Sequence, residues 1–333
     1  MSTVTLVGQP HDVALSHLAL YGAAAMAEQA GLRVRLSWTQ GLRPRPTLTS
    51  EGDTATDVAR AVRACAEAST WTAERITLGT AKRGLMSPRI SPKYDELPWT
   101  ELQQRRNAVI DSTSSQVSTQ RLFGGLGEAS YWYQNRRHEA LVYGAASSWE
   151  MQPRNQGSEL VRNRLDPLRT AVLQRSVDGV KVALTGTRVL DDLAGERSDG
   201  RTSTGLGPLG PTDSVLAWCG LWGLSWLPVV HRTAPFESSV SASSLRGRGL
   251  GRGVDAAVLP IFQSSLTPAR VRSVLVSDAL IRAVADESPE RPASWSWLRS
   301  RGVAGLVRFE VATFRTASAR ERRTQTGSEV RIG

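Results

Sequence analysis

Leu18-Ala19-Leu20-Tyr21-Gly22, near the start of the chain, recurs about two hundred residues later as Leu216-Ala217-Trp218-Cys219-Gly220. Each copy lies in an apolar segment of small residues, which predicts a buried helix. Glycine inside a helix costs about 1 kcal/mol relative to alanine, so its presence indicates that another backbone approaches closely there. We therefore expect two related helices packed against sheets.

The pattern of apolar residues predicts strands and helices that recur in both halves of the chain. Expected strands cover residues 3–8, 33–38, 180–184, 257–262 and 303–316, and expected helices cover residues 13–30, 54–65, 159–176 and a segment beginning at Pro268. Asp12, either Asp53 or Thr54, and Thr267 are the predicted N-terminal caps, and Asp178-Gly179 is typical of a hairpin turn. This pattern indicates an α+β fold with two related αβ halves and mixed or antiparallel sheets, for which a ferredoxin-like arrangement is one candidate.

Composition suggests where the two halves divide. Residues 1–193 form an N-terminal αβ region, residues 194–212 a glycine-rich linker, residues 213–320 a C-terminal αβ region with a basic loop, and residues 321–333 a polar, frayed tail. Residues 80–100 contain three prolines and predict a long surface connection.

The 333-residue sequence has a formal net charge of +10, from 41 Lys and Arg residues against 31 Asp and Glu residues. All but three of the basic residues are arginine, and residues 201–333 hold 17 basic against 10 acidic residues. Arginine pairs bidentately with phosphates and stacks on bases, so this balance favours an acidic partner, nucleic acid first. A GC-rich genome explains the ratio of arginine to lysine equally well, but it does not explain the surplus of positive charge.

A run of arginines and glycines, Arg246-Gly247-Arg248-Gly249-Leu250-Gly251-Arg252-Gly253, lies in this basic last third. Glycine lets the backbone follow a phosphate chain closely, while Arg246, Arg248 and Arg252 supply the charge. We interpret the run as a loop that contacts nucleic acid. The alternative is a solvated loop of a GC-rich gene.

Two further polar segments are candidates for nucleic-acid binding. Asn135, Arg136 and Arg137 follow three consecutive aromatic residues, and such interleaving can stack bases and hold phosphates. A packed strand with an exposed basic end explains the same pattern. Arg154 and Asn155 lie in a second polar loop whose side chains could read base edges.

Several other classes of site are not expected. Cys65 and Cys219 are far apart in apolar helical sequence, which predicts buried free thiols. His11 and His17 fall on different helical faces, so we expect no metal site. No Walker loop, dinucleotide fingerprint or nucleophile elbow is recognisable, and we expect no cofactor and no catalytic residue. The absence of a signal peptide and of a long apolar run predicts a cytoplasmic protein without membrane contact.

Two stretches of the C-terminal half resemble a known family. Asp213-Ser214-Val215-Leu216-Ala217-Trp218-Cys219-Gly220-Leu221, followed by Leu259-Pro260-Ile261-Phe262 and Leu266-Thr267-Pro268-Ala269-Arg270, is similar to subunits of type I CRISPR effector complexes (Cascade) of the I-U/I-G kind. The resemblance covers about a third of the chain and is closest to a large-subunit-like role. It implies contact with the guide RNA and with target DNA and its flanking motif, and assembly with other effector subunits.

The expected function is therefore a non-catalytic, nucleic-acid-binding subunit of an RNA-guided DNA surveillance complex in antiviral defence, in which base pairing reads the sequence. Two alternatives remain open. One is a guide-RNA-processing endoribonuclease with a ferredoxin-like core that uses His138 or His231. The other is a purely structural assembly protein whose tryptophans form protein interfaces.

Overall fold

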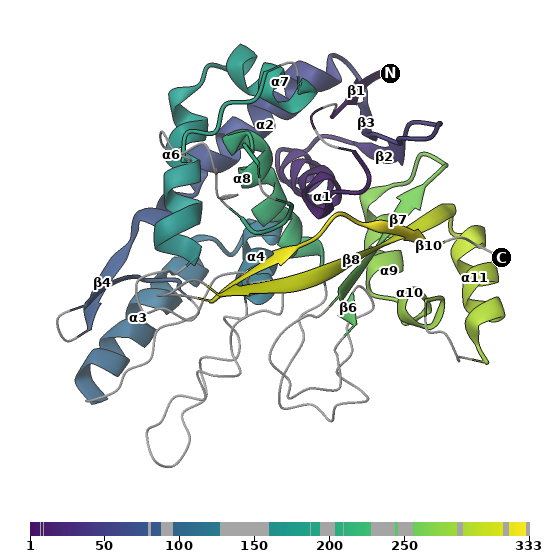
Figure 1. Ribbon diagram of the computed structural model, residues 1–333. Coiled ribbons are helices and arrows are strands. Elements are labelled where there is room, and N and C mark those ends of the chain that lie inside the picture. Colours follow the sequence, from purple (N-terminus) through teal and green to yellow (C-terminus); the bar gives the residue numbers. More distant parts are fainter. Residues whose placement is uncertain are drawn as a thin grey trace.

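The computed structural model confirms the α+β fold, with helices packed around small antiparallel sheets (Figure 1). It describes residues 1–6, 8, 10–78, 81–87, 96–126, 160–186, 188–193, 204–208, 210–227, 244–245, 256–284, 289–315 and 320–330.

The elements of the described chain are as follows. The α-helices are α1 (Ala14–Gln29), α2 (Thr54–Ala68), α3 (Glu96–Ser112), α4 (Val117–Leu126), α6 (Asp166–Gln174), α7 (Val177–Thr185), α8 (Ser214–Gly223), α9 (Pro268–Leu275), α10 (Ala279–Arg282) and α11 (Arg291–Ser300). Short turns of 3-10 or π type are η1 (Thr70–Ala73), η3 (Val161–Leu165) and η4 (Leu224–Trp226). The strands are β1 (Ser2–Thr5), β2 (Arg35–Trp38), β3 (Pro46–Ser50), β4 (Arg75–Leu78), β5 (Ala81–Gly84), β6 (Ser244–Leu245), β7 (Ala256–Phe262), β8 (Val303–Arg315), β9 (Arg320–Thr324) and β10 (Ser328–Val330).

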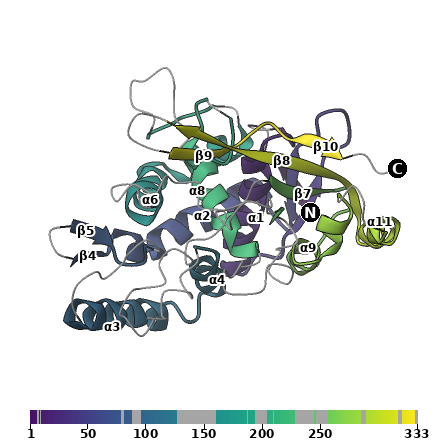
Figure 2. The same ribbon diagram turned by 60° about the horizontal axis from the view of Figure 1, so that its bottom comes forward.

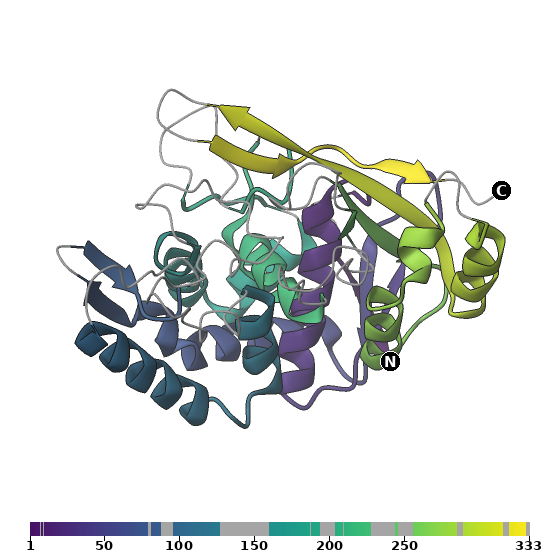
Figure 3. The ribbon, with the colours of Figure 1, turned by 90° about the horizontal axis from the view of Figure 1, so that it is seen from below.

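Helices α1 and α8, which carry the repeated motif, pack directly against each other (Figure 3). A Cβ atom added at Gly22 would lie 1.8 Å from the carbonyl oxygen of Cys219, and one added at Gly223 would lie 2.1 Å from the carbonyl oxygen of Leu18. Neither position therefore has room for a side chain. The predicted close approach of two backbones is confirmed, although it occurs at Gly22 and Gly223, because a Cβ at Gly220 meets a side chain instead.

Helix α1 lies at the centre of the core. It is buried from Ala14 to Ala27. The ring of His17 lies 4.4 Å from the ring of Trp38 in β2 and 5.5 Å from that of Phe309 in β8, measured between centroids. α1 therefore connects both larger sheets to α8, and a single cluster of buried apolar side chains includes residues from both predicted halves.

The first sheet has the strand order β1-β3-β2, and both neighbouring pairs are antiparallel. β1 and β2 are therefore parallel, with β3 between them and α1 as their connection, which is a split β-α-β unit. With α2, the chain follows the element order of a ferredoxin-like fold up to residue 68. The next strand, β4, pairs with β5 in a separate hairpin, so the described residues contain no fourth strand of this sheet.

The second large sheet has the order β10-β8-β7-β6, and β9 also pairs with β8. β7 is buried along its whole length and lies between β6 and β8. Helices α9, α10 and α11 connect β7 to β8 and gather at one end of this sheet (Figure 1).

The described part of the predicted linker is packed into the protein. Leu206 is fully buried, and its carbonyl accepts a hydrogen bond of 2.8 Å from the N–H of Leu15. This carbonyl satisfies a backbone donor in the first turn of α1, where no side chain forms a cap, so the predicted cap at Asp12 is wrong. The carbonyl of Gly205 accepts a hydrogen bond of 3.0 Å from the N–H of Thr324 in β9.

The tail predicted to fray forms strands instead. Residues 320–324 pair with the outer part of β8, and residues 328–330 pair with Arg308 to Leu306. The N–H of Gly327 also donates to the carbonyl of Asp12, at 2.7 Å. Backbone hydrogen bonds thus hold a segment whose polar side chains alone would leave it in solvent.

Three other local predictions can be compared with the structure. The caps at Asp53 and Thr267 are confirmed. The hairpin at Asp178-Gly179 is wrong, because residues 177–185 form α7, whose first turn is capped by the hydroxyl of Ser176 accepting from the N–H of Gly179. The connection predicted over residues 80–100 overlaps β5 and the start of α3.

Candidate nucleic-acid interface

The predicted nucleic-acid-binding residues all lie outside the described residues. They are Asn135, Arg136, Arg137, Arg154, Asn155, Arg246, Arg248 and Arg252. His138 and His231, the histidines of the endoribonuclease alternative, also lie outside. The structure defines the elements from which these segments leave the fold and to which they return.

The basic segment of residues 246–255 connects two neighbouring strands. Leu245, the last residue of β6, pairs with Ala256, the first residue of β7. The segment therefore leaves and re-enters at the same end of the second sheet. Because β7 is buried and central, this end of the sheet is a fixed base for the charges of Arg246, Arg248 and Arg252.

The β8–β9 hairpin brings further arginines to this end of the sheet. Ala256 pairs with Glu310, and β8 continues past it to Arg315, a distance of about 17 Å at about 3.3 Å per residue. Figures 2 and 3 show the hairpin reaching beyond the sheet toward the side of α6 and α8. Residues 311–324 include four arginines and one glutamate, and one of these arginines, Arg323, is buried.

These hairpin arginines were missed by the sequence analysis. Arg315 pairs with Arg320 across the two strands, and Thr313 pairs with Arg322. The basic run 320–323 was visible in the sequence, but its pairing with β8 was not. That pairing places it along the part of β8 that continues past the origin of the basic segment.

Residues 127–159, which hold the other five candidates, connect α4 to the π-turn η3. α4 packs against η4, the continuation of α8, so the start of this segment is attached to the central helix pair.

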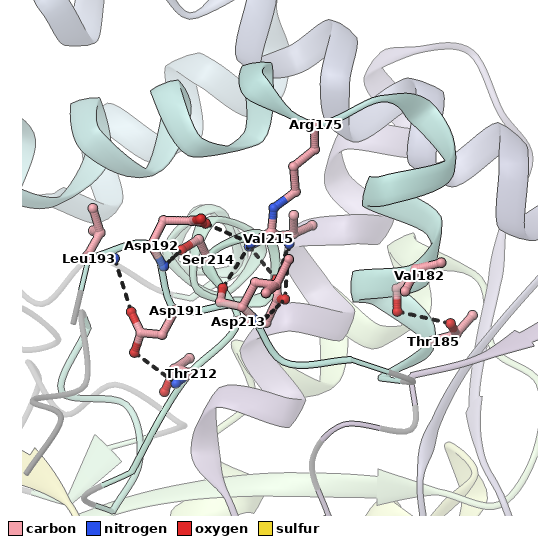
Figure 4. Close-up of polar contacts among 11 residues, drawn as sticks. Arg175, Val182, Thr185, Asp191, Asp192, Leu193, Thr212, Asp213, Ser214 and Val215 are labelled. Carbon is pink, nitrogen blue, oxygen red and sulfur yellow. Dashed lines mark hydrogen bonds and ion pairs between the residues drawn. The ribbon is translucent and has the colours of Figure 1, made fainter. Parts of the chain in front are cut away.

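Asp213, the first residue of the family-like stretch, fixes the start of α8 (Figure 4). Its carboxylate accepts a hydrogen bond of 2.8 Å from the N–H of Val215. Both carboxylate oxygens also accept from one guanidinium nitrogen of Arg175, each at 3.0 Å. Arg175 also donates to Asp192 at 2.7 Å and to the carbonyl of Leu190 at 2.8 Å. Asp213 is 1% exposed, and the partners of its carboxylate come from three segments of the chain.

In this network one guanidinium pairs with two carboxylates. Burial disfavours the guanidinium charge, but the carboxylates of Asp213 and Asp192 outweigh it and raise the pKa of Arg175 above its ordinary value. The Arg175–Asp213 pair is buried with its hydrogen bonds satisfied, and we interpret it as a structural clamp, whereas the side chain of Asp192 is 39% exposed.

The two described histidines are also engaged in the fold. Burial lowers the pKa of His17 to about 3, and its Nε2 donates to the carbonyl of His11 at 2.8 Å. Nε2 of His11 lies 2.7 Å from Oε1 of Glu329 in β10. The described residues contain no group of three or more His, Cys, Asp and Glu side chains placed to hold a metal ion. Cys65 and Cys219 are buried free thiols, as predicted.

Comparison of the chain with family models, with curated proteins and with solved structures finds no match. Among the described residues, no helix is both long enough and apolar enough to cross a membrane.

Proposed function

We propose that this protein is a non-catalytic, nucleic-acid-binding subunit of an RNA-guided DNA-binding complex. The observation that carries the proposal is the position of two arginine-rich segments relative to one end of the second sheet. The basic segment of residues 246–255 begins and ends there, and the β8–β9 hairpin extends past the same point.

This arrangement suits a phosphate backbone. Phosphate contacts provide most of the affinity in nucleic-acid binding, and their geometry rewards arginine, which presents five N–H donors in a planar fork. The sheet supplies a rigid base, and the glycines of residues 246–253 let the main chain approach the phosphates.

The RNA-guided role is supported by the resemblance to type I CRISPR effector subunits. The residues of that resemblance belong to the capped start of α8, to β7 and to the start of α9. Of these elements, β7 carries the C-terminal end of the basic segment. The proposed partners are a guide RNA, target DNA and other effector subunits, in the cytoplasm.

The test measures binding of the purified chain to single-stranded RNA and to duplex DNA at increasing salt. Each phosphate contact contributes about 0.9 to the slope of log affinity against log salt on duplex DNA and about 0.7 on single strands. Replacing Arg246, Arg248 and Arg252 together by alanine lowers the slope on duplex DNA by about 2.7 and leaves the melting temperature unchanged. A flat salt dependence in the wild type contradicts the proposal.

The endoribonuclease alternative is separated by a second assay. Incubation with a repeat RNA hairpin in the absence of metal leaves the RNA intact if the subunit is non-catalytic. Cleavage that is abolished in a His138→Ala variant favours the endoribonuclease instead.

A further inference from the structure

We propose a second nucleic-acid contact at the opposite end of the same sheet, formed by Arg35, Arg270, Arg301 and Trp297. We call these four residues the distal arginine surface. The choice of nucleic acid as its partner rests on the proposed function.

The distal arginine surface is assembled from three elements that are far apart in sequence. Arg35 in β2 donates to the carbonyl of Ser265 at 3.3 Å, and Arg270 in α9 donates to the carbonyl of Ser300 at 3.1 Å. Arg301, directly after α11, lies with its guanidinium carbon 5.2 Å from the centre of the Trp297 ring.

Two short loops bring these arginines to one place. The N–H of Gln263 donates to the carbonyl of Gly302 at 3.2 Å, which joins the loop after β7 to the loop before β8. A Cβ atom added at Gly302 would lie 2.3 Å from the hydroxyl oxygen of Ser264, so the two loops touch. Because Ser265 follows Ser264, the contact of Arg35 lies beside the loop that carries Arg301.

The positive charge of this surface is not neutralised. Arg35, Arg270 and Arg301 are all exposed, and each is held by a carbonyl or an aromatic ring, with no ion pair to a carboxylate among the described residues. The acidic residues of adjoining segments are engaged elsewhere: Glu28 with Arg272, Glu51 with Arg33, and Asp278 and Glu290 with Arg282.

Phosphodiester chemistry fits this surface. Arg35 and Arg270 each use one guanidinium donor on a carbonyl, which orients the group and leaves the remaining N–H donors for a ligand. Exposed Ser264 and Ser265 lie between the arginines, and serine hydroxyls are common partners of phosphate oxygens.

The location favours a polymer as ligand. Phe262, at the end of β7, pairs with Val303, whereas the basic segment enters at Ala256. Six strand steps of about 3.3 Å separate the two ends by about 20 Å. A nucleic acid with one phosphate per strand every 3.4 Å reaches from one region to the other within about six nucleotides.

The experiment compares two variants of equal charge. One carries Arg35→Ala, Arg270→Ala and Arg301→Ala. The control carries Arg33→Ala, Arg60→Ala and Arg282→Ala, which also removes three exposed arginines, but each of these is already paired with a carboxylate. Anisotropy with a labelled duplex DNA and with a labelled single-stranded RNA gives affinity from about 50 to about 200 mM salt.

We expect the affinity of the distal variant to depend less on salt than that of the wild type, and the affinity of the control to keep the wild-type dependence. Three lost contacts lower the slope by about 2.7 on duplex DNA, so the wild-type affinity falls about 40-fold more than that of the variant over this salt range. On single-stranded RNA the corresponding factor is about 18-fold. The nucleic acid whose response reaches its own expected factor is the one that lies on this surface. Binding equal to that of the control overturns the proposal.

Two further variants keep the outcome interpretable. If the triple variant fails to fold, a single Arg301→Glu change reverses one exposed charge, and unchanged binding there overturns the proposal. Weakening by the Arg246, Arg248 and Arg252 variant alone leaves the proposed function standing and rejects the distal contact. If only the distal variant binds more weakly, the distal contact stands and the proposed role of the basic segment is rejected. If the wild type binds no nucleic acid, both proposals are rejected.

Discussion

The contact between α1 and α8 predicts that Gly22→Ala is severely destabilising. The new Cβ would lie 1.8 Å from the carbonyl oxygen of Cys219 and 2.8 Å from the backbone nitrogen of Gly223. Ordinary contact begins near 3.4 Å, so the two helices must separate by about 1.6 Å. A backbone carbonyl inside a helix cannot rotate away as a side chain can.

The magnitude follows from two opposing effects. Overpacking of a core typically costs about 1–3 kcal/mol, and the displaced helix pair also loses contacts of Trp218 and Trp222, which are fully buried. Alanine recovers about 1 kcal/mol of helix propensity at Gly22. We therefore expect a net loss of about 2 kcal/mol, at the upper end of this difference, which corresponds to a fall in melting temperature of about 4 °C at about 2 °C per kcal/mol.

The assay is thermal and urea unfolding of Gly22→Ala beside Gly305→Ala. Gly305 lies in β8 and has nothing within 4 Å of an added Cβ, so its variant should match or slightly exceed the wild type in stability. If Gly22→Ala melts within about a degree of Gly305→Ala, the close approach of the two helices is refuted.

Three further predictions concern the core. Asp213→Ala should destabilise by about 3–5 kcal/mol in urea unfolding, because it leaves the guanidinium of Arg175 buried without its main partner, and a loss under about 1 kcal/mol contradicts the clamp. The folded pKa of His17 is about 3 against 6.5 unfolded, so between these values the unfolded chain binds the extra proton and stability falls with falling pH, by about 2 kcal/mol from pH 7 to pH 5. A His17→Gln variant should lose this pH dependence of the urea midpoint, and an unchanged dependence assigns it to other groups. Gly220→Leu should lower the melting temperature, since its Cβ would lie 2.2 Å from Cδ1 of Leu15, and a wild-type melting curve contradicts that contact.

Local signals in the sequence identified α2 and α9, which begin with a capping side chain, and α1 and α8, which contain a helical glycine. Asp53 and Thr267 start α2 and α9 as expected. The Asp178-Gly179 pair misled because it is also compatible with the first turn of a helix. Burial of Val180, Ala183 and Leu184 at helical spacing decides for α7.

Polar composition led to wrong predictions for segments that are held in the fold by their backbone groups. Residues 204–208 and 320–330 have side chains suited to solvent, yet their carbonyl and N–H groups pair with α1, with β8 and with each other. Hydrogen bonds between segments more than a hundred residues apart leave no local signal. Arg320 and Arg322 pair with nearby residues of β8, but β8 is placed relative to the basic segment by its pairing with β7, in which Ala256 pairs with Glu310, and the local sequence does not reveal that pairing.

The burial of α1 against α8 has a consequence for how the chain is made. A ribosome adding about 5–20 residues per second needs about 10–40 s to reach residues 214–223 after α1 has been synthesised. Throughout that time the nascent N-terminal region carries an apolar helix whose partner does not yet exist. We expect chains that stop before residue 213 to depend on chaperones or to aggregate. Splitting the gene between the two copies of the motif should give two insoluble fragments that recover solubility when they are produced together.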